Sequence, residues 1–516
     1  MAPLSPSARH PSTARGRRTG HSGVVNDGTS LDMPDDRQGP HRAESPREAD
    51  GLWSPGRRAL TIGLVLNVTI VASEALAVGT VLPIVANDLG GIDLYGWVFS
   101  GFFLGNLLGI SVAGILIDRG GLTRPFVMGI GLFSIGLLIG GLAPSMEVLV
   151  GARLVQGFGA GAIPAVAYVS IARAMPERLR PRMFATLSTA WILPGVIGPV
   201  AASSVTHLWT WRVVFLGLLP LIFIAAVLTL PAIRAVAPAP ASPGGPGART
   251  ATVARRSLPL ALSLVVGAGL IVSGLSNVSP VPLVLIAVGL AVGVPSFAAL
   301  TPSGTLRAAT GLPAAVLLRG FMTFAFFCAD AYVPLAIQEV RHESTFLSGL
   351  AYMSATLAWT AGSWVLAHRV ERFGPGRFML AGFLVVLLGI AGFALILLPW
   401  VPPVTALVTW GVAGFGMGLC YSTPSLVVLR EAPIADQGAA TAGLQLSDVL
   451  GASLGTGIGG ALIAYGLRAG SPAWVGLAAT FAIAGAVAIG GFLLTRRLGA
   501  RAAAGLPPAT LEAVAG

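Results

Sequence analysis

The chain is poor in charge and lacks lysine altogether. Asp, Glu, Lys and Arg make up 10% of its 516 residues, whereas a soluble domain carries roughly 25%. All 32 basic residues are arginine, and the formal net charge is +11. Because 54% of the residues are hydrophobic, this positive charge does not indicate a nucleic-acid-binding domain. The composition instead indicates a protein that crosses a membrane many times.

Cysteines and catalytic motifs are also scarce. The two cysteines, Cys328 and Cys420, each lie within an apolar run, which argues against a disulfide framework, a metal site and a thiol nucleophile. The sequence contains no HExxH, no GxxxxGK[ST] and no GxSxG in a usable context. A membrane-bound enzyme would therefore lack a catalytic constellation. We expect neither an enzyme nor a bound metal or cofactor.

Long apolar runs are what the sequence has in abundance. About 20 mainly apolar residues are enough to cross a bilayer as a helix, and fourteen such runs occur. They are residues 60–84, 97–117, 125–143, 147–171, 184–206, 211–232, 258–275, 281–300, 311–337, 346–367, 378–399, 403–427, 439–464 and 473–495. The seventh and eighth are the least distinct, and without them twelve helices remain as the alternative. The sequence predicts an all-α polytopic membrane protein with fourteen transmembrane helices.

Arginine placement supports this arrangement, because cytoplasmic loops are enriched in basic residues. With the N-terminus inside, the cytoplasmic segments near the spans hold twenty arginines: Arg57, Arg58, Arg119, Arg124, Arg173, Arg178, Arg180, Arg182, Arg234, Arg249, Arg255, Arg256, Arg307, Arg369, Arg372, Arg377, Arg430, Arg496, Arg497 and Arg501. The external segments hold three, Arg212, Arg341 and Arg468. We therefore expect a multi-pass protein of the cytoplasmic (inner) cell membrane with both termini in the cytoplasm.

A charged turn, Gly114-Ile-Leu-Ile-Asp118-Arg119-Gly-Gly121-Leu-Thr-Arg124, lies between the second and third runs. Gly114 would let the end of the second helix approach a neighbour closely, as small residues do in membranes. Asp118 could face the positive N-terminus of the thirteenth helix. Gly121 permits a turn that a side chain would hinder. The alternative is a solvated turn whose arginines only fix the topology.

This turn resembles the signature loop of the major facilitator superfamily. Gly114, Asp118, Arg119, Gly121 and Arg124 match its pattern, and the residue before Arg124 departs, because it is Thr where the family usually has a second basic residue. The resemblance implies a fold of two six-helix halves in which the loop acts as a conformational switch.

Two later helices strengthen the resemblance. The stretch Arg153-Leu-Val-Gln156-Gly157-Phe-Gly159 resembles the family's fourth-helix motif, and Trp211-Arg212-Val-Val-Phe215 resembles the start of helix six in fourteen-helix drug:proton antiporters. Gly198-Pro199 resembles the helix-five motif of the antiporter branch. That match is partial, because Pro194, Ala202 and Ser203 stand where the branch has glycine.

The motifs occur twice along the chain. Glu371 follows Asp118 at an offset of 371 − 118 = 253, Gly414–Gly418 follows Gly157–Gly161 at 414 − 157 = 257, and Gly455–Gly459 follows Gly198–Ala202 at 455 − 198 = 257. Weak internal repeats are typical of transporter folds. We predict a disordered tail at 1–57, a six-helix bundle at 58–234, a cytoplasmic linker at 235–257, two peripheral helices at 258–308, a second six-helix bundle at 309–497 and a tail at 498–516.

Five ionisable residues fall within the predicted spans: Glu74, Arg153, Arg319, Asp330 and Asp448. Each costs about 2.5–3.5 kcal/mol to insert and indicates function by default. Depths estimated along the helices pair Glu74 with Arg153, as is common in the superfamily, and Arg319 with Asp448. Asp330 is left without a basic partner and is the repeat counterpart of Glu74, at 330 − 74 = 256. Unpaired carboxyls in a low dielectric bind protons more readily, so we predict proton coupling by the three acids. Purely structural pairs are the alternative.

These features and the resemblance predict a proton-coupled secondary active transporter that exports hydrophobic or drug-like molecules by alternating access, as in multidrug efflux and antibiotic resistance. We expect Gln156, Trp191, Phe327 and Tyr332 to line its substrate cavity, although packing is the alternative role for each aromatic. We also expect a monomer. An uptake symporter for a small metabolite, driven by protons, remains the alternative because the helix-five motif is incomplete.

Overall fold

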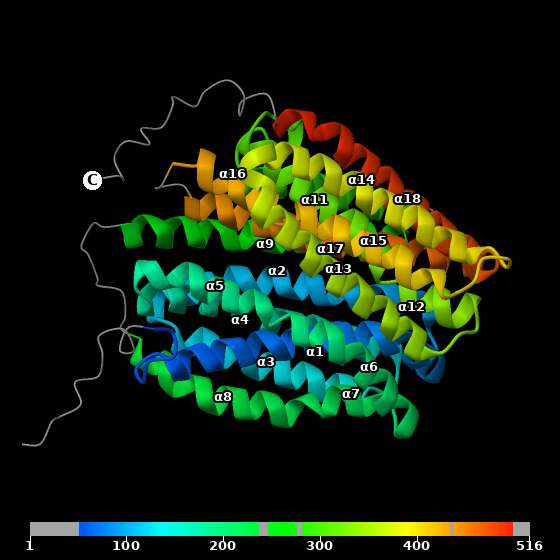
Figure 1. Ribbon diagram of the computed structural model, residues 1–516, viewed down its shortest axis with the longest axis horizontal. Coiled ribbons are helices and arrows are strands. Elements are labelled where there is room, and N and C mark those ends of the chain that lie inside the picture. The colour runs from blue at the N-terminus through cyan, green and yellow to red at the C-terminus, as the bar shows by residue number, and fades with distance from the viewer. Residues whose placement is uncertain (1–50, 237–245, 276–280, 434–436, 499–516) are drawn as a thin grey trace, which may run out of the picture. The chain divides into compact units, whose positions relative to one another are not determined.

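The computed structural model describes residues 51–236, 246–275, 281–433 and 437–498. Within these ranges every regular element is a helix, as the sequence predicted. The long helices run side by side (Figure 1). Of the predicted tails, only residues 51–57 and residue 498 fall within the described ranges.

The helices follow one another in two groups joined by a shorter segment. The N-terminal helices are α1 (Arg58–Leu89), η1 (Ile92–Leu94), α2 (Tyr95–Gly120), α3 (Thr123–Gly141), α4 (Met146–Ala174), η2 (Glu177–Leu179), α5 (Arg180–Thr189), α6 (Ile192–Leu208), α7 (Arg212–Leu216) and α8 (Leu218–Ala235). The joining segment holds α9 (Pro246–Leu275), α10 (Val281–Leu300) and η3 (Thr305–Arg307). The C-terminal helices are α11 (Leu312–Asp330), α12 (Val333–Leu335), the π-helix η4 (Ala336–Val340), α13 (Thr345–Phe373), α14 (Pro375–Ala394), η5 (Leu395–Leu397), α15 (Thr405–Cys420), α16 (Thr423–Glu431), α17 (Gln437–Arg468) and α18 (Ala473–Leu494).

Two sets of turns close the long helices. The turn after Asp118 joins α2 to α3 and marks one end, which we name the Asp118 end, at the left of Figure 1. The η1 turn, which contains Asp93, joins α1 to α2 and marks the opposite Asp93 end.

Twelve helices in the described ranges are long and apolar enough to cross a membrane. They include Leu258–Leu275 and Pro282–Leu300, which correspond to the two least distinct apolar runs. The predicted count of fourteen is not confirmed. Residues 184–206 are divided between α5 and α6, which leaves only the shorter apolar helix Ile192–Leu208. Residues 346–367 lie in α13, which has 29 residues but many Ser, Thr and Tyr side chains that lower its mean hydropathy.

The break between α5 and α6 has a local cause. Pro194 has no N–H to donate to the carbonyl of Ala190, four residues earlier. That carbonyl instead accepts a hydrogen bond from Thr69 Oγ1 of α1, at 3.3 Å. A backbone group that proline frees inside a membrane needs such a partner. The single span predicted at 184–206 is therefore divided into two helices.

Each group contains a glycine-rich helix packed closely against a neighbour. Cβ atoms added to α4 or α15 would collide with backbone carbonyls of α2 or α13. The pairs are Gly157 with Phe102, Gly161 with Asn106, Gly414 with Ala355 and Gly418 with Trp359. The contacted carbonyls are also related by the repeat, at 355 − 102 = 253 and 359 − 106 = 253. The internal repeat of the sequence is thus a repeat of helix packing.

The charged turn is repeated in backbone conformation. Gly121 ends α2 with φ +80°, and Gly374 ends α13 with φ +78°. Residues with a side chain rarely adopt such positive φ values. Gly121 therefore has the conformation that the sequence predicted, and Gly374 has it in the second group.

The two joining helices lie against a contact between the groups. α9 packs on both α2 and α17, which also touch each other, and α10 packs on α9. Leu107 of α2 joins Ala261, Leu264 and Phe297 in a small apolar cluster apart from the main core. Residues 246–257, part of the linker predicted at 235–257, form the first turns of α9, because after Gly247 they contain several alanines and arginines, which favour helix, and no proline. Residues 237–245 of that linker lie outside the described ranges.

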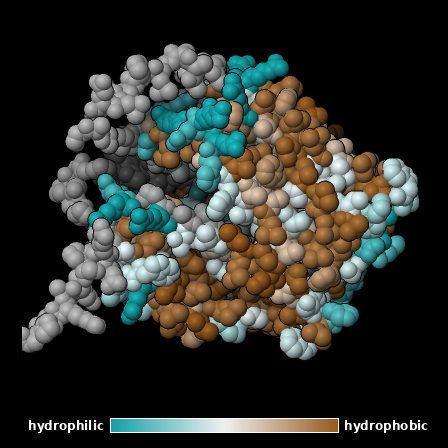
Figure 2. All heavy atoms as spheres, viewed as in Figure 1, coloured by the Kyte–Doolittle hydropathy of each residue, from teal (hydrophilic) through white to brown (hydrophobic). Residues whose placement is uncertain are grey.

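The surface has the pattern of a protein embedded in a bilayer. Apolar side chains cover the middle of the face in Figure 2, and hydrophilic side chains gather towards the two ends. The exposed large hydrophobic residues include many on α8, α10 and α14. This arrangement places the apolar band where lipid tails would contact it.

Candidate functional site

Arg153 of α4 and Glu74 of α1 form an ion pair whose side chains are 2% and 0% exposed. Arg153 Nη1 donates to Glu74 Oε1 and, at 2.8 Å, to Gln156 Oε1 one turn along α4. Its Nε donates to the Val98 carbonyl at 3.2 Å, and its guanidinium lies over the Phe102 ring. Among the described residues, Glu74 Oε2 has no hydrogen-bond partner. The pair therefore joins α1, α2 and α4 while leaving one carboxylate oxygen free.

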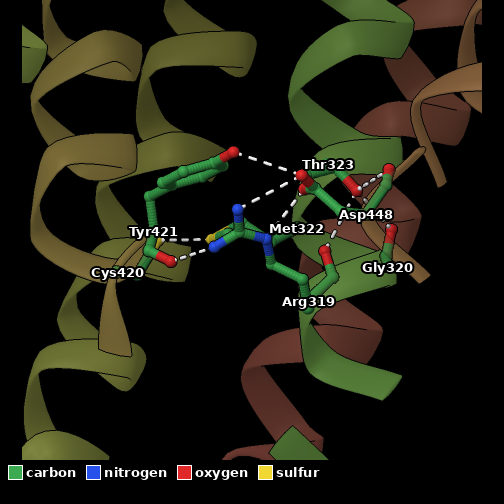
Figure 3. A network of polar contacts seen from close by, with 7 residues as sticks. All are labelled: Arg319, Gly320, Met322, Thr323, Cys420, Tyr421 and Asp448. Atoms are coloured by element: carbon green, nitrogen blue, oxygen red, sulfur yellow. Dashed lines mark hydrogen bonds and ion pairs between the residues drawn. The ribbon is translucent and has the colours of Figure 1, made fainter. Parts of the chain in front are cut away.

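A second buried pair joins α11 to α17 (Figure 3). Arg319 Nε donates to Asp448 Oδ1 at 2.7 Å, and Nη2 donates to Asp448 Oδ2 at 3.2 Å. The guanidinium lies 3.3 Å from the Tyr421 ring centroid, while Nη1 donates to the Tyr421 carbonyl. Tyr421 Oη donates to Asp448 Oδ2 at 3.1 Å. This forked geometry is the stronger kind of arginine–carboxylate pair.

Asp330, at the end of α11, has a different environment. Trp410 Nε1 donates to its Oδ1 at 3.1 Å, and Tyr352 Oη donates to its backbone carbonyl at 2.9 Å. Within the described ranges no basic side chain forms an ion pair with Asp330. The three acids are therefore paired as the sequence predicted. Glu74 and Asp448 each form an ion pair with an arginine, and in the described ranges Asp330 forms none.

The Arg319–Asp448 pair faces the N-terminal helices. Tyr168 of α4 lies within electrostatic range of both charges and is 42% exposed, while the Asp448 side chain keeps 21% of its surface. Tyr168 packs on Phe184, with ring centroids 5.6 Å apart, and Tyr421 packs on Trp359 at 5.1 Å. Aromatic side chains of both groups, Tyr168 and Tyr421, thus lie near an acid that is only partly buried, an arrangement that suits an apolar molecule with a cationic group.

The four residues expected to line a substrate cavity lie in different settings. Gln156 and Tyr332 are fully buried in this conformation. Gln156 holds Arg153, and Tyr332 donates to the Thr456 carbonyl. Phe327 packs against Phe103 of α2, with ring centroids 5.8 Å apart, and so joins the two groups. Trp191 is exposed and lies at the break between α5 and α6.

Polar contacts between the two groups concentrate at the Asp93 end. Asn87 Nδ2 donates to Glu339 Oε1 at 2.6 Å, Gln338 Nε2 donates to the Thr80 carbonyl at 3.1 Å, Tyr95 Oη donates to the Ala331 carbonyl at 3.3 Å, and Arg468 Nη2 lies 3.7 Å from Asp93 Oδ2. Deeper in the molecule, the hydroxyls of Ser100 and Ser453 are 3.1 Å apart. Sequence reasoning missed these residues. Their only signal is that polar side chains such as Asn87, Gln338 and Glu339 interrupt or flank apolar runs.

The π-helix η4 carries two of these contacts. Residues Ala336–Val340 form its five-residue turn, and Arg341 N donates to the Ala336 carbonyl at 3.2 Å. The turn presents Gln338 and Glu339 to α1, and Gln338 is held in place by Ser348 Oγ at 3.1 Å. Short π-helical turns are rare and occur frequently at functional sites.

In the described ranges, the Asp118 turn makes no polar contact with the C-terminal helices. Asp118 is exposed, and Arg173 of α4 is the basic residue within its electrostatic range. No hydrogen bond or ion pair joins Asp118 to the described part of α17, and a Cβ on Gly438 would meet nothing within 4 Å. A Cβ on Gly114 would also meet nothing, so the close approach expected at Gly114 is absent. In this conformation the described residues therefore show neither the Asp118 contact near Gly438 nor the close approach at Gly114 that the sequence predicted. Arg119 and Arg124 flank the turn on either side.

The helix-five residues join the two groups at another place. A Cβ on Gly195 of α6 would collide with Thr356 of α13, and a Cβ on Gly349 of α13 would lie 3.2 Å from the Pro199 backbone. Gly198 is looser, because its Cβ would be 3.8 Å from the Ser73 carbonyl of α1. The Gly-Pro segment therefore lies at the α6–α13 contact.

Trp211 and Arg212 connect the start of α7 to α1 through hydrogen bonds. Trp211 Nε1 and Arg212 Nη1 both donate to Asp88 Oδ2, at 2.8 and 3.0 Å. Arg212 also donates to the Ala143 carbonyl at 3.3 Å. No three His, Cys, Asp or Glu side chains in the described ranges are grouped so that they could hold a metal ion.

Comparison with known proteins fits this geometry. The sequence profile of the Major Facilitator Superfamily matches residues 62–455, more than half of the chain. A protein of Mycobacterium tuberculosis described as a probable multidrug-efflux transporter is 25% identical over 420 residues, which cover 78% of this chain and 87% of that one. The multidrug efflux pump SdrM of Staphylococcus aureus is 25% identical over 427 residues, covering 79% and 90% of the two chains.

A solved structure has a similar fold. The crystal structure of the POT family transporter PepTSo aligns with a TM-score of 0.64 at 15% identity, covering 85% of this chain and 98% of that one. The matched region contains both buried arginine–carboxylate pairs and the Asp118 turn. The chain therefore belongs to the Major Facilitator Superfamily and is a multi-pass membrane transporter.

Proposed function

We propose that this transporter exports lipophilic, drug-like molecules across the cytoplasmic membrane in exchange for protons. Relatives named as multidrug-efflux proteins support the export of such molecules. The aromatic pairs beside Asp448 support a lipophilic substrate, with a cationic group near that carboxylate.

The observation that carries the proton coupling is the unequal environment of the three acids. Glu74 and Asp448 each lie on an arginine, whereas Asp330 has only the neutral Trp410 donor at its carboxylate. A carboxyl without a positive partner can lose or gain a proton without leaving a buried arginine unpaired. Asp330 is therefore the first proton carrier that we assign, with Glu74 as its repeat counterpart.

The position of Asp330 suggests when it would exchange protons. Its neighbour Ala331 accepts the Tyr95 hydrogen bond that helps to join the two groups at the Asp93 end. Opening of this end breaks that bond and admits water to Asp330. Closing it, and opening the Asp118 end, exposes the Arg319–Asp448 region instead. Alternating access of this kind is how such folds couple two solutes.

We assign the Asp118 end to the cytoplasm, because the predicted cytoplasmic segments carry most of the arginines. We also retain fourteen spans and two six-helix groups as part of the proposal. α5 and α6 pack against α1, and α13 packs against α6 and α15. α13 is also long enough to cross a bilayer at 1.5 Å per residue.

The test is gradient-driven transport in proteoliposomes, with a fluorescent lipophilic cation as the probe. Asp330→Asn should abolish uphill transport under an imposed pH gradient, while downhill exchange persists because the amide keeps the shape of the side chain. Glu74→Gln should have the same effect. Glu177→Gln is the matched control, because that carboxyl is largely exposed and forms a surface ion pair with Arg180, three residues away.

Full gradient-driven transport by the Asp330→Asn/Glu74→Gln double variant would refute both assignments and leave Asp448 as the remaining candidate proton carrier.

Transport direction has its own test, because a proton-driven uptake symporter remains the alternative. Inverted vesicles whose lumen is more acidic than the bath should accumulate the probe. Accumulation only in right-side-out vesicles would establish uptake.

A further inference from the structure

A groove of about 970 Å³ runs between α14 and α18 at the Asp93 end. Small residues face one another across it, with Ala391 and Ala394 on α14 and Ala478, Ala482 and Gly485 on α18. The three α18 positions are spaced by four and three residues, so they share one face of the helix. Because its lining is almost wholly apolar, the groove can hold a hydrocarbon chain.

A positive charge stands at the mouth of this groove. Arg341, directly after η4, lines the groove and donates to the carbonyls of Leu398, Pro399 and Val401 at 3.0, 3.2 and 2.9 Å. These acceptors are neutral, and in the described part of the chain no carboxylate forms an ion pair with Arg341. Its Nε is buried and has no hydrogen-bond partner among the described residues. Arg341 is therefore fixed in place with its charge uncompensated.

Trp474 completes the mouth. It lines the groove at the first turn of α18 and is 50% exposed. Half-exposed tryptophans are typical of the level of lipid headgroups. Leu395 and Ile489, which also line the groove, are exposed on the outer surface. The groove is consequently open to the bilayer along its side.

We propose that this groove binds an anionic phospholipid, with one acyl chain between α14 and α18 and the headgroup phosphate beside Arg341. A zwitterionic lipid would bring a cationic group towards the same arginine, and a free anion would leave the apolar groove unfilled. Only an amphiphile with net negative charge satisfies both halves of the site.

The bound lipid has a consequence for the transport cycle, which rests on the proposed function. Arg341 is three residues from Gln338 and two from Glu339, which bind α1 through Thr80 and Asn87. The η4 turn and the Glu343 N bond to the Ile337 carbonyl, at 3.0 Å, tie these positions into one unit. A lipid that holds Arg341 stabilises the closed Asp93 end, because binding favours the state that binds more tightly.

The first experiment measures lipid retention by native mass spectrometry of the full-length protein in mild detergent. Phosphatidylglycerol and phosphatidylcholine with identical acyl chains compete at equal concentration. We expect the protein to prefer phosphatidylglycerol by about fivefold, which corresponds to one arginine near a headgroup. Arg341→Gln should remove this preference, Arg341→Lys should keep part of it, and Ala482→Leu should reduce retention of both lipids. Arg212→Gln is the control, because Arg212 is already paired with Asp88.

Equal retention of the two lipids, or an unchanged preference in Arg341→Gln, would overturn the proposal. So would a dimer that Ala482→Leu dissociates, because a second copy of the chain would then occupy the groove. Glycerol phosphate should not compete, since it has no chain, and competition would show a headgroup site alone. None of these readouts requires transport, so they can fail independently of the proposed function.

The second experiment tests the coupling. Cysteines at positions 87 and 339 should cross-link faster when phosphatidylglycerol is added, and the acceleration should vanish in an Arg341→Gln background. An equal rate with and without the lipid would refute the coupling while leaving the binding site intact.

Discussion

At the scale of single residues, each buried arginine is matched to one carboxylate. Arg153 is 2% exposed and Arg319 is 6% exposed, and each donates hydrogen bonds to a carboxylate and to a backbone carbonyl and lies over an aromatic ring. Removing one member of a buried ion pair leaves the other charge without water or partner, whereas removing both leaves neither. The energetic importance of these pairs is therefore visible only when single and double replacements are compared.

Arg153→Met should destabilise the protein by about 3–5 kcal/mol, and Arg153→Met/Glu74→Met should recover most of that loss. Unfolding can be followed with a thiol-reactive dye, because Cys328 and Cys420 are buried free thiols. Glu177→Met is the control, since Glu177 is largely exposed and such surface pairs contribute little. A double variant no more stable than the single one would show that the pair is not a coupled unit.

Asp118→Asn should slow transport by roughly two- to fivefold, the effect of losing one charge–dipole contact, with unchanged apparent affinity for the probe. Asp118 is exposed in this conformation, so we propose that its stabilising contact forms in the state in which the Asp118 end is closed. Initial rates over a range of probe concentrations separate the two parameters. A loss of affinity at a normal maximal rate would place Asp118 in substrate binding instead.

The sequence predicted the charged residues better than their neutral partners. Glu74, Arg153, Arg319, Asp330 and Asp448 were identifiable because a charge within an apolar run is costly and therefore rare. The contacts of Tyr95 and Gln338 were not identifiable, because both bind backbone carbonyls of distant segments. Any residue offers such a carbonyl, so no pattern of side chains marks it.

At the scale of helices, small residues set how closely neighbours approach. The glycines of α4 and α15 face backbone carbonyls of α2 and α13, and in membranes such close packing is a principal source of helix association. Hydropathy predicted most of the long helices, but two points needed the structure. α13 is not among the twelve apolar spans, because polar side chains such as Ser354 face neighbouring helices. The break between α5 and α6 depends on Pro194 and on Thr69 from another helix.

Gly161→Ala should destabilise the α2–α4 contact by about 1–3 kcal/mol, because the added methyl group overpacks a filled interface. Gly151→Ala, on the same helix, should be neutral or stabilising, since a Cβ there meets nothing within 4 Å and alanine favours helix. Gly418→Ala should resemble Gly161→Ala if the packing repeat holds. Melting followed by circular dichroism compares the three, and equal melting temperatures would contradict the packing argument.

At the scale of the whole molecule, the contacts of the Asp93 end hold the N-terminal and C-terminal helices together. They come from η1, α1 and α2 on one side and from α11, η4 and α17 on the other. Transport by alternating access requires that these contacts break in every cycle.

Asn87→Cys/Glu339→Cys should therefore arrest transport when the two thiols are joined by a short bifunctional cross-linker. The native side chains are 2.6 Å apart between Nδ2 and Oε1, and the two native cysteines are buried. A cleavable linker should restore transport after reduction, and either single cysteine should remain active with the reagent. Undiminished transport by the cross-linked protein would show that this end does not open.

The position of α9 gives the transporter two unlike flanks. Two groups of helices meet along two lateral seams, one between α2 and α17 and the other between α6 and α13. On the first flank α9 seals the seam, since Val272 lies against Gly457 and Gly269 lies near Trp97 and Leu104. α10 adds a second wall outside it. In the described part of the chain, α9 and α10 therefore cover the α2–α17 seam and not the α6–α13 seam, so the two flanks present different surfaces to the lipid.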